Sequence, residues 1–82
     1  MNKILITIVV PMIEKEYDVF IPVSKNVGVA KKLIIKAINE LTENHFPIKD
    51  KCTLMSSNGD ILSNMQTIKE CNIKNGDKII LI

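Results

Sequence analysis

The most informative part of the chain is residues 3–22, KILITIVVPMIEKEYDVFIP. Over residues 4–10, large apolar residues recur at every second position, which is the spacing of a β-strand with one face in a core. Pro11 has no backbone N–H to donate, so it ends this strand. Alternation resumes over residues 16–21. Two such strands joined by a short turn at residues 12–15 predict a β-hairpin.

The period changes after the hairpin. Asn26 is a favourable residue for capping a helix N-terminus, and apolar residues then recur at helical spacing. The residues expected on the inner face of this helix are Val27, Ala30, Ile34, Ala37, Ile38 and Leu41. An amphipathic helix is therefore expected from residue 27 to residue 43, with Pro47 preventing its continuation.

Strand signals return in the second half of the chain. Residues 51–55 are expected to form a third strand, and the turn at 56–60 contains Asn-Gly, a strong hairpin signal. Residues 61–62 are an optional, short fourth strand. Residues 78–82 are expected to form the last strand of the sheet. A hairpin, one helix and further strands predict an α+β fold, in which one helix packs across one face of a mixed sheet of four to five strands.

Length and composition limit the protein class. The 82 residues predict a single domain covering residues 1–82, and 46% hydrophobic with 24% charged residues is a globular composition. No apolar run approaches the length of a membrane-spanning helix, so no membrane insertion is expected. The apolar N-terminal run lacks a signal-peptide cleavage site and is interpreted as a strand. Cys52 and Cys71 are too few for a disulfide framework, which favours a reducing, cytoplasmic location.

Catalytic and metal-binding residues are scarce. His45 is the single histidine, and Cys52 and Cys71 lie in no paired metal or redox motif. A nucleophile, base and orienting group are hard to assemble with one histidine, and the isolated glycines form no phosphate-binding loop. We therefore expect no catalytic site, no metal site and no cofactor, and interpret both cysteines as structural thiols.

Clustered lysines on a helix are one feature of nucleic-acid-binding sites. Lys31, Lys32 and Lys36 cluster on the predicted helix, but Glu40 and Glu43 share its outer face. The net charge is only +2, and aromatic residues make up only 4% of the chain. These features favour a solvated helix surface, so no nucleic-acid partner is expected.

The sheet face turned away from the helix is the strongest candidate for a site. Six large apolar residues are expected to point outward there: Leu5, Val9, Phe20, Met55, Ile80 and Ile82. Contiguous exposed apolar patches tend to mark partner surfaces, so these residues predict a protein-binding face. Coverage by loops or an Ile-rich composition are alternative explanations. A shift of one residue in any strand would also exchange the two faces.

The segment that leads into the predicted last strand is residues 67–79, TIKECNIKNGDKI, which begins with a predicted short turn. This segment is similar to the loop, short 3₁₀ turn and final strand of ubiquitin-like β-grasp proteins, with Ile68 and Ile73 at apolar core positions. Together with residues 19–23, VFIPV, and the last ten residues, IKNGDKIILI, the chain resembles the YukD and EsaB family of bacterial type VII secretion systems. The resemblance implies a small cytoplasmic accessory component of the secretion machinery, neither an enzyme nor a conjugated modifier.

The C-terminal residues bear on the mode of action. Conjugated ubiquitin-like proteins and sulfur carriers end in a flexible Gly-Gly tail, because their carboxylate has to enter a narrow activating channel. This sequence ends at Ile82, which is expected to remain paired in the last strand. We therefore expect a non-covalent interaction module. The alternatives are a carrier or modifier of the sulfur-carrier type, and a domain that weakly self-associates through its exposed edge strand or face.

Overall fold

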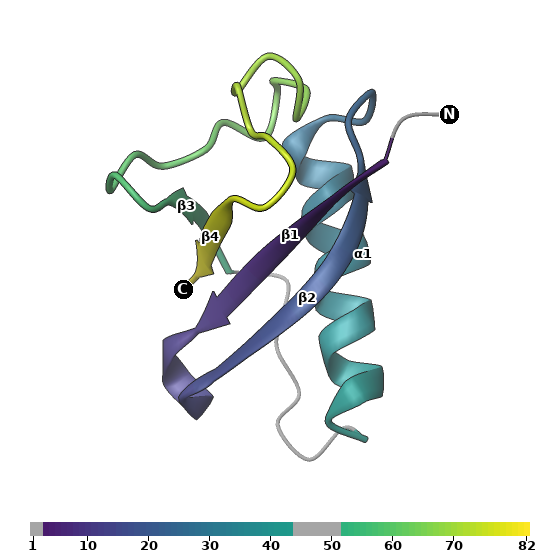
Figure 1. Ribbon diagram of the computed structural model, residues 1–82, viewed down its shortest axis with the longest axis vertical. Helices are drawn as coiled ribbons and strands as arrows, with labels where there is room; N and C mark the ends of the chain where they lie inside the picture. The colour runs from purple at the N-terminus through teal and green to yellow at the C-terminus, as the bar shows by residue number, and fades with distance from the viewer. Residues whose placement is uncertain (1–2, 44–51) are drawn as a thin grey trace.

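The computed structural model describes residues 3–43 and 52–82. Its elements are β1 (Lys3–Val10), the 3₁₀ helix η1 (Pro11–Ile13), β2 (Lys15–Pro22), α1 (Val27–Leu41), β3 (Leu54–Ser56) and β4 (Lys78–Leu81). The strands form one sheet in the order β2-β1-β4-β3, and α1 packs across one face of it (Figure 1). The predicted α+β class and mixed sheet with one helix are confirmed, with four strands.

The N-terminal hairpin forms the long half of the sheet. β1 pairs antiparallel with β2 over its whole length, up to the pair Val10↔Lys15, and Pro11 ends the strand as predicted. Glu14 closes the turn in the left-handed conformation, with φ of 52°. β4 then lies parallel to β1 and antiparallel to β3, which makes the sheet mixed.

The helix begins where the sequence predicts. The side-chain oxygen of Asn26 accepts a hydrogen bond from the N–H of Val29 at 3.0 Å, so Asn26 is the N-cap. The helix ends at Leu41, two residues before the predicted end at residue 43. Glu43 has a left-handed φ of 53°, which is incompatible with a continuing α-helix.

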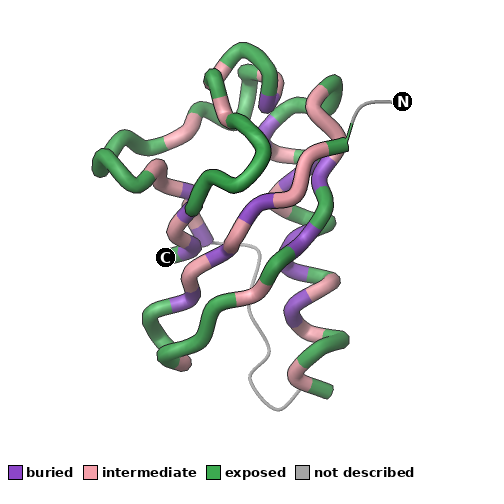
Figure 2. Tube along the Cα trace, in the orientation of Figure 1, coloured by how far each residue is buried: buried purple, intermediate pink, exposed green. Residues whose placement is uncertain are grey.

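The hydrophobic core lies between α1 and the inner face of the sheet (Figure 2). The buried side chains of the hairpin and helix are Ile6, Ile8, Val10, Val19, Ile21, Val27, Ala30, Ile34, Ile35 and Ile38. Those of the second half of the chain include Cys52, Leu54, Ile68, Ile79 and Leu81. The prediction for Leu41 is wrong: it is 59% exposed, because it lies in the last turn of the helix, past the core.

The third strand is shorter than predicted and begins later, at Leu54–Ser56. Before it, Thr53 exchanges two backbone hydrogen bonds with Ile82, at 2.6 and 2.9 Å, which extend the pairing of β3 with β4. Two sequence-based predictions fall outside the described residues, the helix stop at Pro47 and the strand start at Lys51. The single histidine, His45, lies outside them too.

The predicted strand at residues 61–62 is reduced to a single bridge. Met55 pairs with Ile61, and the N–H of Leu62 donates to the carbonyl of Leu54 at 2.9 Å. Gly59 provides the positive φ of 92° that the preceding turn requires. The chain therefore contacts β3 briefly and then leaves the sheet without forming a fifth strand.

The segment before β4 is fastened to β1. The side-chain oxygen of Asn75 accepts from the N–H of Leu5 at 2.8 Å, and the N–H of Gly76 donates to the carbonyl of Leu5 at 2.7 Å. The N–H of Thr7 donates to the carbonyl of Asp77 at 2.9 Å. These bonds prolong the contact between β1 and the C-terminal part of the chain beyond the short strand β4.

Candidate protein-binding face

All six predicted site residues lie on the sheet face turned away from α1. Their neighbours along each strand are the buried residues of the inner face, so the pleat directs these six outward. Phe20 is 68% exposed and Ile82 is 48% exposed. The other four, which are Leu5, Val9, Met55 and Ile80, are half-buried by their neighbours in the sheet.

The strand register brings four apolar residues into one line across the sheet. Val9 pairs with Ile80, Ile80 with Met55, and Met55 with Ile61. We call Val9, Ile80, Met55 and Ile61 the apolar row. Directly paired residues on one sheet face have Cβ atoms about 5 Å apart, so the four side chains form a continuous surface. Ile82, the residue that follows β4, lies on the same face, two residues beyond Ile80.

Ile61 is not among the six residues that the sequence predicts for this face. It is 63% exposed and forms the outer end of the apolar row. The signal was present in the Asn-Gly turn at residues 58–59, since a tight turn there returns the chain opposite Met55.

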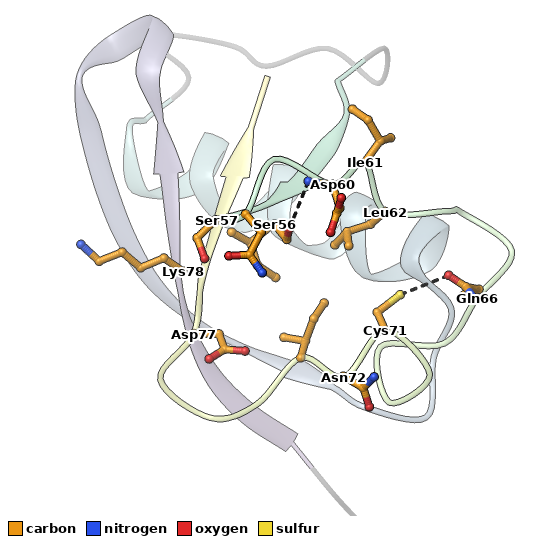
Figure 3. A pocket seen from close by; sticks show the side chains of 13 residues that line it. Ser56, Ser57, Asp60, Ile61, Leu62, Gln66, Cys71, Asn72, Asp77 and Lys78 are labelled. Atoms are coloured by element: carbon orange, nitrogen blue, oxygen red, sulfur yellow. Dashed lines mark hydrogen bonds between the residues drawn. The ribbon is translucent and has the colours of Figure 1, made fainter.

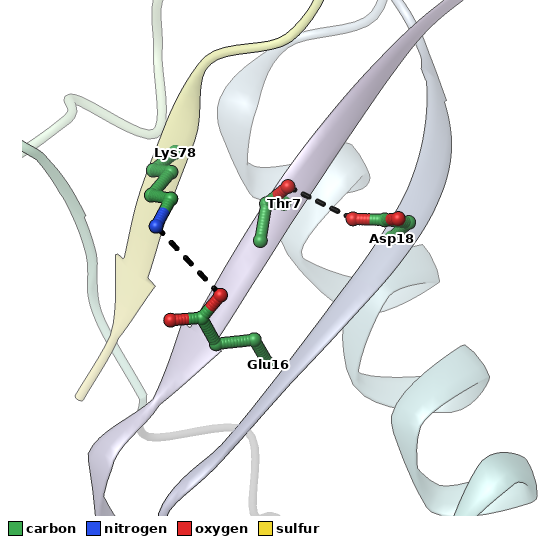
Figure 4. A network of polar contacts seen from close by, with 4 residues as sticks. All are labelled: Thr7, Glu16, Asp18 and Lys78. Carbon is green, nitrogen blue, oxygen red and sulfur yellow. Dashed lines mark hydrogen bonds and ion pairs between the residues drawn. The ribbon is translucent and has the colours of Figure 1, made fainter.

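A polar line divides the predicted site. The Thr7 hydroxyl donates to the Asp18 carboxylate at 2.8 Å, and the Lys78 Nζ lies 3.8 Å from the Glu16 carboxylate (Figure 4). Thr7 pairs with both Asp18 and Lys78, so these three residues form the polar line, which runs beside the apolar row across three strands. Glu16 pairs with Val9 and so lies at the β2 end of the apolar row. The Lys78–Glu16 pair is more than half exposed and contributes at most about 1 kcal/mol to stability.

Leu5 and Phe20 lie on the far side of that polar line. They are directly paired with each other, on β1 and β2. The structure therefore brings together Val9, Met55, Ile80 and Ile82 but separates them from Leu5 and Phe20, which the sequence had grouped with them.

A hollow of about 450 Å³ opens beside the end of the apolar row (Figure 3). Ile61 and Asp60 line one side of it, and Cys71 and Asp77 belong to the segment on the other side. The N–H of Asp60 donates to the Ser56 hydroxyl at 3.2 Å, which holds the turn at its rim. Its lining mixes apolar and polar groups.

The two cysteines are both thiols that are not joined in a disulfide, and their surroundings differ. Cys52 is 8% exposed and belongs to the core. Cys71 is half-buried, and its thiol lies 3.7 Å from the side-chain oxygen of Gln66. Burial raises the pKa of the Cys71 thiol, and the nearby carboxylate of Glu70 raises it further. Near neutral pH Cys71 is therefore a protonated, weakly nucleophilic thiol.

The helix lysines have no aromatic or further basic cluster around them on α1. Lys32 and Lys36 are exposed, and Glu40 is exposed on the same helix. Within residues 3–43 and 52–82, no three His, Cys, Asp or Glu side chains are grouped in a way that could hold a metal ion.

Comparison with known proteins gives structural matches only. No protein-family model matches the sequence, and no curated protein matches it either. The fold does match that of the EccD5 ubiquitin-like domain from Mycobacterium xenopi, with a TM-score of 0.84, 16% identity, and coverage of 100% of this chain and 94% of that one.

Two further structures match the fold. The ubiquitin-like domain of the Mycobacterium tuberculosis type VII secretion system protein ECCD1 has a TM-score of 0.77 and 12% identity, covering 100% of this chain and 99% of that chain. A chain of the MycP5-free ESX-5 inner membrane complex has a TM-score of 0.82 and 15% identity, and the match covers 100% of this chain but 21% of that chain.

The helix content also bears on the membrane. In the part of the chain that the structure describes, no helix combines the length and the apolar character needed to cross a bilayer.

The strand order, the helix across one face and the structural matches agree with one another. This chain folds as a ubiquitin-like β-grasp and resembles the ubiquitin-like domains of type VII secretion proteins.

Proposed function

We propose that this chain is a single-domain, non-covalent interaction module that binds a protein partner through its apolar row. The observation that carries the proposal is the alignment of Val9, Ile80 and Met55 by direct strand pairing, extended by Ile61. These side chains are held on a hydrogen-bonded sheet, so a partner that covers them orders little additional structure. When a protein covers the apolar row, apolar surface is removed from water, and this removal favours binding.

We further propose a cytoplasmic, non-catalytic role as an accessory component of a type VII secretion system. Two of the similar structures are ubiquitin-like domains of EccD proteins, and a third is part of an inner membrane complex. The resemblance to the YukD and EsaB family points to the same context. By this proposal the partner is a component of the secretion machinery.

The test is a charge placed within the apolar row. Met55→Asp introduces a carboxylate among Ile80, Ile61 and Val9, and should abolish partner binding and secretion while the fold remains intact. The matched control is Met65→Asp, because Met65 is 87% exposed and undergoes the same chemical change. Met65 lies in a segment whose backbone carbonyls accept from the first residues of α1. Circular dichroism establishes that both variants fold.

Secretion assays and affinity pull-downs with the secretion-system components then measure function. Wild-type levels of secretion and of partner binding for the folded Met55→Asp variant would show that the apolar row is not the docking surface. Equal losses in Met55→Asp and Met65→Asp would point to a general effect of added charge and contradict the proposal in the same way.

A further inference from the structure

The edge strand β2 offers a second surface, independent of the apolar row. In the sheet formed by the described residues, with the order β2-β1-β4-β3, β2 has a neighbour on one side only. It is eight residues long, Lys15–Pro22, and pairs along its whole length with β1. An edge strand of this length presents backbone donors and acceptors that another extended segment can use.

The bonds of β1 fix which backbone groups point outward. Successive residues of a strand direct their backbone groups to opposite neighbours. On β1, the Leu5 carbonyl accepts from Gly76 at 2.7 Å and the Thr7 N–H donates to Asp77 at 2.9 Å. Leu5 and Thr7 therefore face the β4 side, and the alternate residues of β1 face β2.

The alternation carries over to β2. Ile6 and Ile8 face β2, where their direct partners are Val19 and Tyr17. These residues of β2 thus turn their N–H and C=O groups inward, to β1. The residues that turn theirs to the free side are Glu16, Asp18 and Phe20. Among residues 3–43 and 52–82, no backbone group bonds to these three from that side.

The flank of α1 next to this edge is apolar. Leu33 and Leu41 are 46% and 59% exposed, and Ala37 lies between them at four-residue spacing. Helical spacing puts this stripe on the flank of α1 opposite Ile35. Ile35 lines a hollow together with Asn64, which belongs to the connection that follows β3. The stripe therefore lies on the β2 side of the helix, with which α1 is in contact (Figure 1).

The outer-face side chains along the edge are acidic and aromatic. Glu16 and Asp18 are exposed carboxylates, and Phe20 follows at 68% exposure. Lys78 approaches Glu16 from the opposite side, across β1, while Asp18 accepts a hydrogen bond from neutral Thr7. Opposite charges on directly paired strand residues are stabilising, so the edge favours basic residues on an incoming strand.

We propose that the free edge of β2 binds an extended protein segment by strand addition, and that this segment carries basic residues opposite Asp18 and Glu16 and an apolar residue opposite Phe20. Its backbone bonds to the outward groups of these three residues. Its intervening residues are apolar and cover Leu33 and the flank of α1. This surface goes beyond the proposed docking through the apolar row and does not depend on it.

A second copy of this chain fits the edge poorly. If two β2 strands pair antiparallel with Asp18 at the centre, Asp18 of one copy lies opposite Asp18 of the other. If the centre moves one residue toward the N-terminus, to Tyr17, Glu16 of one copy lies opposite Asp18 of the other. Like charges directly opposite each other destabilise a strand pair. A shift the other way places Glu16 opposite Pro22, which has no N–H to donate.

The experiment uses a synthetic probe. The peptide has the core Ile-Val-Lys-Ile-Lys between Gly-Ser ends, which in antiparallel orientation sets Ile opposite Phe20 and the two Lys opposite Asp18 and Glu16. Binding is followed by NMR, with hydrogen exchange of the individual backbone amides. We expect the amides of Glu16, Asp18 and Phe20 to become protected, because those amides acquire acceptors.

Two controls separate strand addition from general adhesion. A peptide with Glu in place of each Lys should bind at least about fivefold more weakly, and the double variant Glu16→Lys, Asp18→Lys should reverse this preference. A peptide N-methylated at the amides that face β2 should not bind. Met55→Asp should leave peptide binding unchanged, which distinguishes this site from the apolar row.

Any of three results with the peptides overturns the proposal. These are no binding of the basic peptide at millimolar concentration, equal affinity of the basic and acidic peptides, and binding without protection of the three edge amides. Protection of those amides by raising the concentration of the protein alone would show that a second copy occupies the edge, and would overturn it as well.

Discussion

Asn75 holds the backbone of Leu5, a residue 70 positions earlier in the chain, through a 2.8 Å hydrogen bond from the Leu5 N–H to the Asn75 side-chain oxygen. The N–H of the next residue, Gly76, donates to the Leu5 carbonyl at 2.7 Å. One turn therefore satisfies both backbone groups of Leu5. This fastening lengthens the contact of the C-terminal segment with β1, which is otherwise limited to three paired residues.

The fastening predicts the effect of a substitution. Asn75→Ala removes the acceptor from the Leu5 N–H and should lower the free energy of unfolding by about 1–2 kcal/mol. Asn75→Asp keeps an acceptor at the same position and should lose less. Urea denaturation measures both. Equal stability of Asn75→Ala and the wild type would show that water replaces this bond without cost.

The two faces of β1 should respond differently to truncation. Ile8 is fully buried on the inner face, so Ile8→Ala should lower the free energy of unfolding by about 2–5 kcal/mol. Val9, the next residue, is half-buried on the outer face, and Val9→Ala should cost about 1 kcal/mol or less. Thermal unfolding of the pair measures the difference, and the reverse order would mean that the faces are exchanged.

The turn at residues 67–70, earlier in the segment that leads to β4, begins with two reciprocal capping hydrogen bonds. The Thr67 hydroxyl accepts from the N–H of Glu70 at 3.0 Å, and the Glu70 carboxylate accepts from the N–H of Thr67 at 2.8 Å. Thr67→Val keeps the shape and removes one cap, so it should destabilise the protein by about 1 kcal/mol. The double variant with Glu70→Ala should show coupling in a double-mutant cycle. Strict additivity of the two changes would contradict a capping box.

The reactivity of Cys71 should depend on pH. Because burial and then Glu70 raise the pKa of this thiol, the thiolate fraction at a given pH is smaller than in an ordinary cysteine. Alkylation with iodoacetamide should therefore accelerate only at a higher pH than for a free cysteine peptide. Glu70→Gln removes the second cause and should shift the profile downward. A profile identical to that of the free peptide would contradict the shielding of this thiol.

The sequence predicts the faces of the strands well but not their pairing. Period two identified Ile6, Ile8 and Val19 as inner and Val9 and Phe20 as outer residues, because burial on one face requires that alternation. Which outer residues adjoin depends on the strand order and register, and these arise from contacts between distant segments. For that reason the polar line between Phe20 and the apolar row could not be foreseen.

The ends of helices and strands are also hard to predict from the sequence. Leu41 follows the helical spacing of the core residues yet is exposed, since spacing does not reveal where a helix outruns the sheet beneath it. Residues 61–62 have strand-forming residues but make one bridge only, because the chain turns away after Leu62. The Asn-Gly turn before these residues is evident in the sequence, but the position of Ile61 on the outer face depends on its register with Met55.

The most direct test of the proposed function is site-specific photo-crosslinking in cells that contain the secretion system. A photoreactive residue in place of Met55 should crosslink to a component of the type VII machinery, and the same residue in place of the 87% exposed Met65 should not. Crosslinks to the machinery from position 65 with none from position 55, or none from either position while secretion still requires the protein, would contradict docking through the apolar row.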